Sequence, residues 1–245
     1  RGSVRTREAA TSVPFSSDTP TKTREPELAD LPEIIFNGSR EIKMVALTFD
    51  ICEAPDNLSG YAAGIEEYLV ESNTPATFFI SGHWMSRNPE IIQRLASNPL
   101  FEIGNHSWSH PDFRDLESWE IADEINQTND LFFDLTGQEI TLFRLPGGTY
   151  YPFTLTEIFK TSMAVIQWDV VTADPVPDND AENILRIVQE RTQNGSIIIM
   201  HANGRGWHTE EALPLIINWL KEQGYQIVTI STMLEKSGYK LDYNE

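Results

Sequence analysis

Four polar side chains with catalytic or metal-binding chemistry follow short apolar runs of this chain. They are Asp50, His106, His110 and His201. A carboxylate can accept a proton from water, an imidazole can donate one, and two imidazoles can bind one metal ion. Together with an oxyanion-binding loop, these residue types are suited to metal-assisted hydrolysis of an acyl group.

The spacing of His106 and His110 favours a shared metal ion. They stand four positions apart in His-Ser-Trp-Ser-His, so one helical turn would direct both imidazoles to the same side. The alternative is a pair of solvated or helix-capping histidines. The preceding Glu102-Ile-Gly-Asn segment after a predicted strand favours the metal site.

Asp50 and His201 are the candidate proton-transfer residues. Asp50 at a strand end can bind a metal or accept a proton, although a turn or helix-capping aspartate remains the alternative. His201 follows four apolar residues, and a partner such as Asp174 can hold it protonated, as an acid requires. The alternative is a core histidine bonded to backbone. For His83 we favour a structural, hydrogen-bonding role.

The segment after Arg144 reads Leu-Pro-Gly147-Gly148. Its glycines allow close approach of the backbone to a ligand, and an exposed N–H there can bind an oxyanion. A plain turn is the alternative. Aromatic faces suit sugar rings, and several lie near these motifs: Trp108, Trp168, Trp207, Tyr150 and Tyr151.

Short apolar runs rich in β-branched and aromatic residues predict the strands that position these groups. They are residues 44–49, 76–80, 101–103, 141–143, 164–168, 196–200 and 226–230. Helical periodicity lies between them, as at Ile184, Ile187 and Val188. Asn88-Pro89 predicts a helix over about 89–97, and Thr209 predicts another helix start.

This β-then-α alternation predicts a parallel sheet, either open and doubly wound or closed into a barrel. Reactive groups of such sheets gather at the carboxyl ends of the strands. Polar residues stand at these positions here: Asp50, His106, His110, Arg144, Asp169, Asp174 and His201.

Composition limits the class of partner. Among 245 residues, 37 acids against 18 bases give a net charge of −19, which disfavours nucleic acid as a partner. Cys52 is the single cysteine, so an intrachain disulfide is excluded, and no apolar run is long enough for a transmembrane segment. We expect a flexible tail or linker at 1–32 and one catalytic domain at 33–245.

Five ordered motifs resemble those of the NodB-type polysaccharide deacetylases, carbohydrate esterase family 4. The resemblance covers about residues 41–235. The motifs are Thr48-Phe49-Asp50, Ala76-Thr-Phe-Phe-Ile-Ser-Gly82, Glu102-Ile-Gly-Asn-His106-Ser-Trp-Ser-His110, Arg144-Leu-Pro-Gly-Gly148 and Ile199-Met-His201.

The resemblance implies an α/β fold, a distorted (β/α) barrel with about seven parallel strands, and removal of acetyl groups from N-acetylated sugars. Asp50 then matches the general base and Arg144 the arginine that positions it. His201 matches the general acid, and Asp174 the aspartate that tunes it. Gly147 matches the residue whose backbone N–H binds the oxyanion.

His106 and His110 match two ligands of a divalent metal, usually zinc. The third ligand in the family is a second aspartate, and Ile51 stands in its place. An isoleucine cannot bind a metal, so Asp50, Glu53 or water must complete the site, or tight metal binding is lost.

Further departures from the family concern the substrate side. Gly147 stands where an aromatic residue is usual, so one wall of the sugar site is missing or rebuilt. Val171 and Pro175 replace an acid and a tryptophan around Asp174. We expect Tyr150, Trp207 and His208 near the substrate, with a plain loop position as the alternative for His208.

Three functions remain open at this point. The first is an active deacetylase of a peptidoglycan- or chitin-like polymer, which the retained catalytic residues favour. The second is an impaired, carbohydrate-binding relative, suggested by Ile51. The third is a hydrolase of a non-sugar amide or an O-acetyl ester. The resemblance implies a secreted, periplasmic or cell-envelope location, and the sequence, which starts at Arg1, contains no signal peptide.

Overall fold

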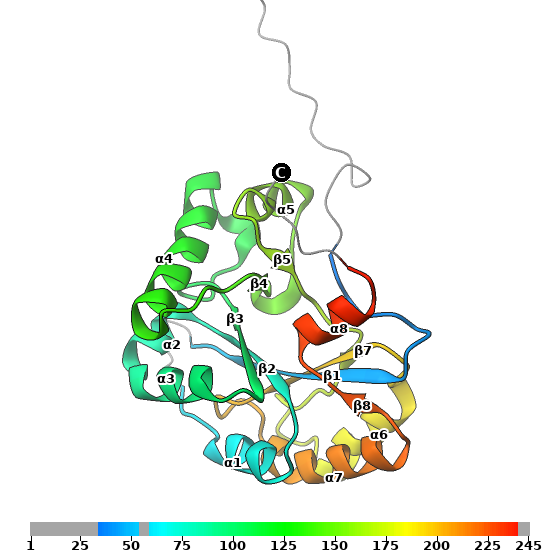
Figure 1. The fold of residues 1–245 in the computed structure, drawn as a ribbon. Helices are drawn as coiled ribbons and strands as arrows, with labels where there is room; N and C mark the ends of the chain where they lie inside the picture. Colours follow the sequence, from blue (N-terminus) through cyan, green and yellow to red (C-terminus); the bar gives the residue numbers. More distant parts are fainter. Residues whose placement is uncertain (1–33, 54–58, 240–245) are drawn as a thin grey trace, which may run out of the picture.

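The computed structural model describes residues 34–53 and 59–239 (Figure 1). The expected tail at 1–32 lies outside these residues. Within them the chain alternates strands and helices, and every strand pair is parallel.

The strands form one sheet in the order β5-β4-β3-β2-β1-β7-β6, with β8 also paired to β1. Their bounds are β1 Met44–Ile51, β2 Ala76–Ile80, β3 Phe101–Asn105, β4 Leu142–Phe143, β5 Ala164–Val165, β6 Val170–Val171, β7 Ser196–His201 and β8 Gln226–Ile227. The two ends of this order, β5 and β6, are joined in the chain by residues 166–169 alone. The sheet therefore curls back on itself, and the expected distorted (β/α) barrel is confirmed.

The predicted strands occur in the predicted order, with shifted ends. β6 was not predicted as a separate strand. The predicted strand at 164–168 contains only β5, and the residues just after it, Val170 and Val171, form β6 and pair with β7. The predicted strand at 226–230 is too long. β8 ends at Ile227, and helix α8 begins at Ile230.

Helices surround the sheet (Figure 1). Their bounds are α1 Ala63–Glu71, α2 Gly82–Arg87, α3 Pro89–Ser97, α4 Ser118–Thr136, α5 Pro152–Phe159, α6 Ala181–Arg191, α7 Thr209–Glu222 and α8 Ile230–Lys236. The prediction of a helix at 89–97 is confirmed with Pro89 at its first turn, but the Asn88 side chain bonds the carbonyl of Trp84 instead of capping it. None of the described helices has the length and apolar character that crossing a membrane requires.

Strand β1 divides its side chains between two layers. Val45, Leu47, Phe49 and Ile51 belong to the larger apolar core, which includes residues of the outer helices. Met44 and Ala46 belong to a second core with inward residues of the other strands and with α8. Because side chains alternate along a strand, Asp50 continues this inward row and emerges at the carboxyl end of the barrel.

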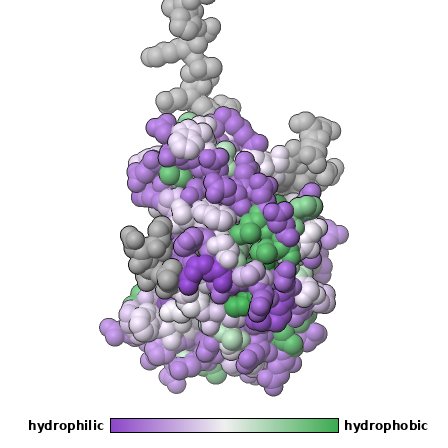
Figure 2. Space-filling model, turned by 90° about the vertical axis from the view of Figure 1, so that its left-hand side faces the viewer, coloured by the Kyte–Doolittle hydropathy of each residue, from purple (hydrophilic) through white to green (hydrophobic). Residues whose placement is uncertain are grey.

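The surface has a different character. The face shown in Figure 2 is largely hydrophilic, with apolar groups gathered mainly in a patch near its centre. This agrees with the high net charge of the chain, since charged residues are kept at the surface.

Candidate active site

The carboxyl ends of the strands surround one cavity of about 250 Å³. Asp50 and His201 are register partners on the adjacent strands β1 and β7, while His106 follows β3 directly. The lining residues are Asp50, Cys52, His106, His110, Gly147, Trp168, Val171, Asp174, Pro175, Ile199, His201 and Arg205. Most of the residues proposed from sequence therefore meet in a single place.

Asp50 is a buried carboxylate held by a buried cation. Only 4% of Asp50 is exposed, and its Oδ1 lies 2.8 Å from Nη1 of Arg144. Burial alone would raise the pKa of Asp50, but the positive charge of Arg144, with His106 and His201, outweighs it and lowers the pKa. Asp50 is thus kept ionised, as a proton acceptor must be.

Arg144 itself is fully buried and fixed on every side. It donates to the hydroxyl of Thr48 at 2.9 Å and to the carbonyls of Ile166 and Gln167 at 3.3 Å. Its guanidinium lies over the ring of Phe79, 4.0 Å from the centroid. Such a rigid arrangement fixes the orientation of the Asp50 carboxylate.

His106 and His110 do come together, but not on a helical turn. The chain from 106 to 110 is a loop, with left-handed backbone at Ser107 (φ 65°) and His110 (φ 56°). The expectation of a helical turn was wrong. The loop brings the ring centroids within 4.9 Å of each other, so proximity is reached by a different backbone path.

Both imidazoles are held in the form that binds metals. His106 Nδ1 lies 2.9 Å from the carbonyl of Arg144, which accepts its proton and leaves Nε2 with a free lone pair. Burial lowers the pKa of His106, and burial with the nearby His106 lowers that of His110 to about 3. Neutral imidazoles fit a divalent cation, so the family's metal is compatible with these two residues.

A cysteine that was not proposed from the sequence lies beside the two imidazoles, and Asp50, one of the two proposed third ligands, has Oδ2 3.5 Å from Nε2 of His106. Ligand atoms of Cys52, His106 and His110 all lie within 4.8 Å of one another. Glu53 points elsewhere, since its carboxylate lies 2.6 Å from Arg87 and 3.0 Å from His83. Ile51 is fully buried in the helix-side core.

His201 is paired with Asp174 as proposed for an acid. Its Nδ1 lies 3.0 Å from Oδ1 of Asp174, and its backbone N–H donates to Oδ2 at 2.7 Å. The hydroxyls of Thr172 and Thr209 complete the bonding of this carboxylate. Burial alone would lower the pKa of His201, but the bond and charge of Asp174, aided by Asp50, raise it.

The wall expected to be missing or rebuilt is open at Gly147, and an aromatic side chain lies beside the next residue, Gly148. Gly147 lines the cavity with left-handed backbone (φ 62°), and open space lies where its side chain would be. Trp168 also lines the cavity and packs against Gly148, where an added Cβ would be 2.8 Å from the indole. An aromatic face thus reaches the site from the β5–β6 connection. Tyr150 packs against the core and is absent from this lining.

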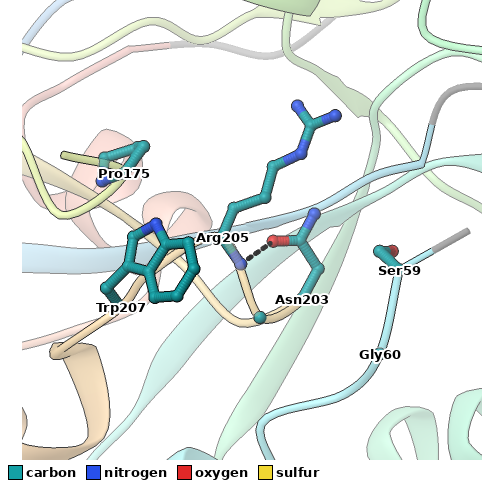
Figure 3. Close-up of a pocket in the computed structure, with 7 residues that line it drawn as sticks. Ser59, Gly60, Pro175, Asn203, Arg205 and Trp207 are labelled. Atoms are coloured by element: carbon teal, nitrogen blue, oxygen red, sulfur yellow. Dashed lines mark hydrogen bonds between the residues drawn. The ribbon is translucent and has the colours of Figure 1, made fainter. Parts of the chain in front are cut away.

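A second cavity of about 370 Å³ adjoins the first, since Pro175 and Arg205 line both. Figure 3 shows Trp207 beside Pro175, with Ser59 and Gly60 across the opening. Trp207 is 61% exposed. His208 is not in the lining of either cavity, and its Nδ1 lies 3.0 Å from Glu211 on α7.

Arg205 extends from its loop as Figure 3 shows, and it lines both cavities. Its backbone N–H donates to Asn203 at 3.2 Å. Within residues 34–53 and 59–239, its guanidinium forms no hydrogen bond or ion pair. It lies near enough to oppose the protonation of His110 and His201.

Sequence reasoning missed Cys52, Arg205 and the place of Trp168. The period of two along a strand is a signal that could have found Cys52, since it stands two residues after Asp50. Asp169 was grouped with the site residues but lies elsewhere, bonded to Arg40 and Ser196.

These motifs can now be compared with known proteins. The polysaccharide deacetylase family matches residues 37–166 of the chain. The chain belongs to the polysaccharide deacetylase family.

The proteins similar to this chain include proteins named as deacetylases and one named as a pseudoenzyme. The chain is 31% identical over 208 residues to the peptidoglycan-N-acetylglucosamine deacetylase PgdA of Listeria monocytogenes, spanning 85% of this chain and 42% of PgdA. It is 26% identical to the uncharacterised protein YlxY of Bacillus subtilis, over 84% of this chain and 62% of YlxY. The chain therefore spans less than two thirds of either relative.

The structure is also similar to that of BA3943, a carbohydrate esterase family 4 pseudoenzyme from Bacillus anthracis. The TM-score is 0.74 at 31% identity, over 84% of this chain and 70% of BA3943. Family membership thus supports a deacetylase. The similarity to a pseudoenzyme means that activity depends on whether each catalytic group is retained.

Proposed function

We propose that this chain hydrolyses the acetamide of N-acetylated sugars in a cell-envelope polymer, releasing acetate and leaving a free amine. One observation carries the proposal. Asp50 and the Asp174-paired His201 are register partners that line one cavity together with a neutral imidazole pair. Amide hydrolysis needs a base for water and an acid for the leaving amine, and both are present.

The two proton-transfer groups are tuned in opposite directions. Arg144 keeps Asp50 ionised, so Asp50 accepts a proton from the attacking water. Asp174 binds Nδ1 of His201 and raises its pKa, so His201 donates a proton through Nε2 to the departing nitrogen. Separating the pKa values of two neighbouring groups assigns one as base and the other as acid.

His106 and His110 would hold a divalent ion, as in the family. When bound, such an ion supplies Lewis acidity toward water and the acetyl carbonyl. The backbone N–H of Gly147, at the cavity wall, would donate to the carbonyl oxygen as negative charge develops there. Trp168 would pack against the sugar and exclude water from the reacting carbonyl.

The second cavity supports a polymeric substrate. Trp207 offers an exposed aromatic face for a neighbouring sugar ring. The Arg205 guanidinium, at the junction of both cavities, favours a substrate that carries carboxylates. Peptidoglycan has such groups and chitin does not, so we favour peptidoglycan and a secreted or envelope location, which also agrees with the similarity to PgdA.

A binding role with little turnover is the second candidate. Ile51 in place of the family's aspartate and the similarity to the pseudoenzyme BA3943 favour it. The two candidates differ in one measurable quantity, the release of acetate.

The test is an acetate assay with and without added zinc. Peptidoglycan fragments, acetylated chitooligosaccharides, acetylated xylan and a simple linear amide serve as parallel substrates. Release of acetate from a sugar polymer, abolished in Asp50→Asn, supports the deacetylase. Binding of glycan without acetate from any substrate would establish the binding role instead. Acetate from xylan or the linear amide alone would point to the esterase or non-sugar amidase.

A further inference from the structure

The buried thiol of Cys52 lies beside the imidazole pair in the proposed active site. Only 2% of Cys52 is exposed, and it lines the same cavity as His106 and His110. Its Sγ and one nitrogen of each imidazole all lie within 4.8 Å of one another. Cysteine and histidine are the ligands that zinc prefers in proteins.

The carboxylates around the cavity are already engaged. Glu53 is held by Arg87 and His83, and Asp174 by His201 and two threonines. Asp50 gives one oxygen to Arg144. The donors that remain beside the imidazoles are Oδ2 of Asp50, 3.5 Å from Nε2 of His106, and the sulfur of Cys52.

The free lone pair of His106 lies beside Asp50, in the cavity that Cys52 also lines. Nδ1 of His106 is bonded to the Arg144 carbonyl, so Nε2 is left to accept, and it lies 3.5 Å from Oδ2 of Asp50. A cation bound by Nε2 would satisfy both atoms.

Burial and the nearby charge of Asp50 raise the pKa of Cys52 to about 12, so its sulfur is a thiol unless a bound cation replaces the proton. The side-chain amide of Asn203 donates toward Sγ at 3.6 Å and also holds the Cys52 carbonyl. Donors beside a ligand sulfur support its negative charge and fix its position. Asn203 is itself buried, so the arrangement is built into the β7–α7 connection.

Strand geometry explains why position 52 rather than 51 is used. Successive side chains alternate, so Asp50 and Cys52 lie toward the cavity while Ile51 lies in the helix-side core. Cys52, the first residue after β1, lies beside the two imidazoles.

We infer that Cys52 is the third protein ligand of the metal, giving a Cys-His-His site in place of the family's Asp-His-His site. This inference rests on the proposed function only for the catalytic use of the metal, not for the identity of its ligands. A thiolate is a soft ligand, so the site should favour zinc and cobalt over magnesium and manganese.

Cobalt(II) is the probe that tests this directly in the full chain kept reduced. Wild-type protein loaded with cobalt should show an intense thiolate-to-cobalt absorption in the near ultraviolet. Cys52→Ser should lose this band and bind zinc more than about 10-fold more weakly in a chelator competition. Cys52→Asp, which restores a carboxylate, should recover zinc affinity without the band, and Asp50→Asn should keep the band.

X-ray absorption of the zinc-loaded wild type provides a second readout that needs no variant. One sulfur at about 2.3 Å from zinc is expected. A zinc shell of nitrogen and oxygen alone, or Cys52→Ser with unchanged zinc affinity and a native circular dichroism spectrum, would overturn the proposal. Acetate release without a sulfur ligand would overturn this inference and leave the proposed function standing. A sulfur ligand without acetate release would support this inference and contradict the proposed function.

Discussion

Two aspartates on one short segment, Asp169 and Asp174, have opposite fates at the two ends of strand β7. Asp169 bonds Ser196 and the N–H of Ile197 where β7 starts, and Asp174 bonds His201 where β7 ends. The length of β7 separates these places by roughly 16 Å. β6 runs alongside β7 between them, so the two aspartates serve opposite ends of the barrel.

The two ends also treat their charges differently. Asp169 is partly exposed and pairs with the exposed Arg40, whereas Asp50 and Arg144 at the other end are buried. Ion pairs of similar geometry therefore have different roles at the two ends. The Arg40–Asp169 pair stabilises the start of β7, and the buried Arg144–Asp50 pair orients a reactive carboxylate.

The largest contrast is expected between neutralised carboxylates. Asp50→Asn should lower deacetylation about 10²- to 10⁴-fold, because the base that accepts the proton is lost. Asp169→Asn should leave turnover within about twofold, because it lies at the opposite end. Acetate release by both variants at saturating substrate checks this. Equal losses would mean that the two ends are not separate.

The second contrast concerns the arginines and is measured as the free energy of unfolding. Arg144→Met removes a fully buried cation and leaves Asp50 uncompensated, so a loss of about 3–5 kcal/mol is expected. Arg40→Met breaks a pair whose arginine is 40% exposed and should cost less than about 1 kcal/mol. Urea unfolding of both variants decides the matter, and similar costs would contradict the difference in burial.

The third contrast concerns pH. Because Asp174 raises the pKa of His201, the acid stays protonated to a higher pH than a free histidine, and activity falls as pH rises through that raised pKa. Asp174→Asn should move this fall to lower pH, because the bond and the charge that favour the protonated imidazole are lost. Asp169→Asn should leave the profile of kcat against pH unchanged. A profile that does not move in Asp174→Asn would exclude His201 as the acid.

The smallest contrast concerns substrate contacts. Trp207→Ala should raise KM for a polymer about 3- to 10-fold with little change in kcat, because it removes an aromatic face from the second cavity. Phe133 is also exposed, near the end of α4, and Phe133→Ala should leave KM unchanged. Kinetics on long and short glycans measure both, and an unchanged KM in Trp207→Ala would place the polymer elsewhere.

Arg205 extends that contrast to the choice of polymer. Arg205→Met should lower the preference for carboxylate-bearing peptidoglycan over chitooligosaccharides by about fivefold, since it removes the charge at the junction of the cavities. The ratio of kcat/KM for the two substrates measures this. A preference unaffected by the substitution would leave Trp207 as the main contact.

Much of the fold could be read from local patterns. Apolar runs predicted the order of the strands, and β2 was placed at its observed bounds because a continuously buried strand has a clear start and end. The strand predicted at 226–230 extends beyond the observed end of β8. Val228 and Ile230 are as apolar as strand residues, but Val228 follows the strand and Ile230 begins α8, and both are buried in the second core. Periodicity cannot distinguish these two kinds of burial.

The candidate site shows the same division. Residue type and strand-end position singled out Asp50, His106 and His201, because chemistry and local sequence coincide there. Strand-end position alone put Asp169 with Asp174, since both follow the same apolar run, although only Asp174 was proposed as the partner of His201. The pairing of β6 with β7 places Asp169 at the start of β7 and Asp174 at its end.

The sequence by itself determined which groups could react and that parallel strands would present them, because both depend on residue type and local periodicity. The tertiary structure alone decided that Trp168 packs against Gly148 at the cavity wall and that Cys52 lies beside two imidazoles distant in the chain. These contacts depend on the curvature of the curled sheet, which brings strand ends that are far apart in the chain around one cavity. Curvature is a property of the whole sheet, and no local window of residues contains it.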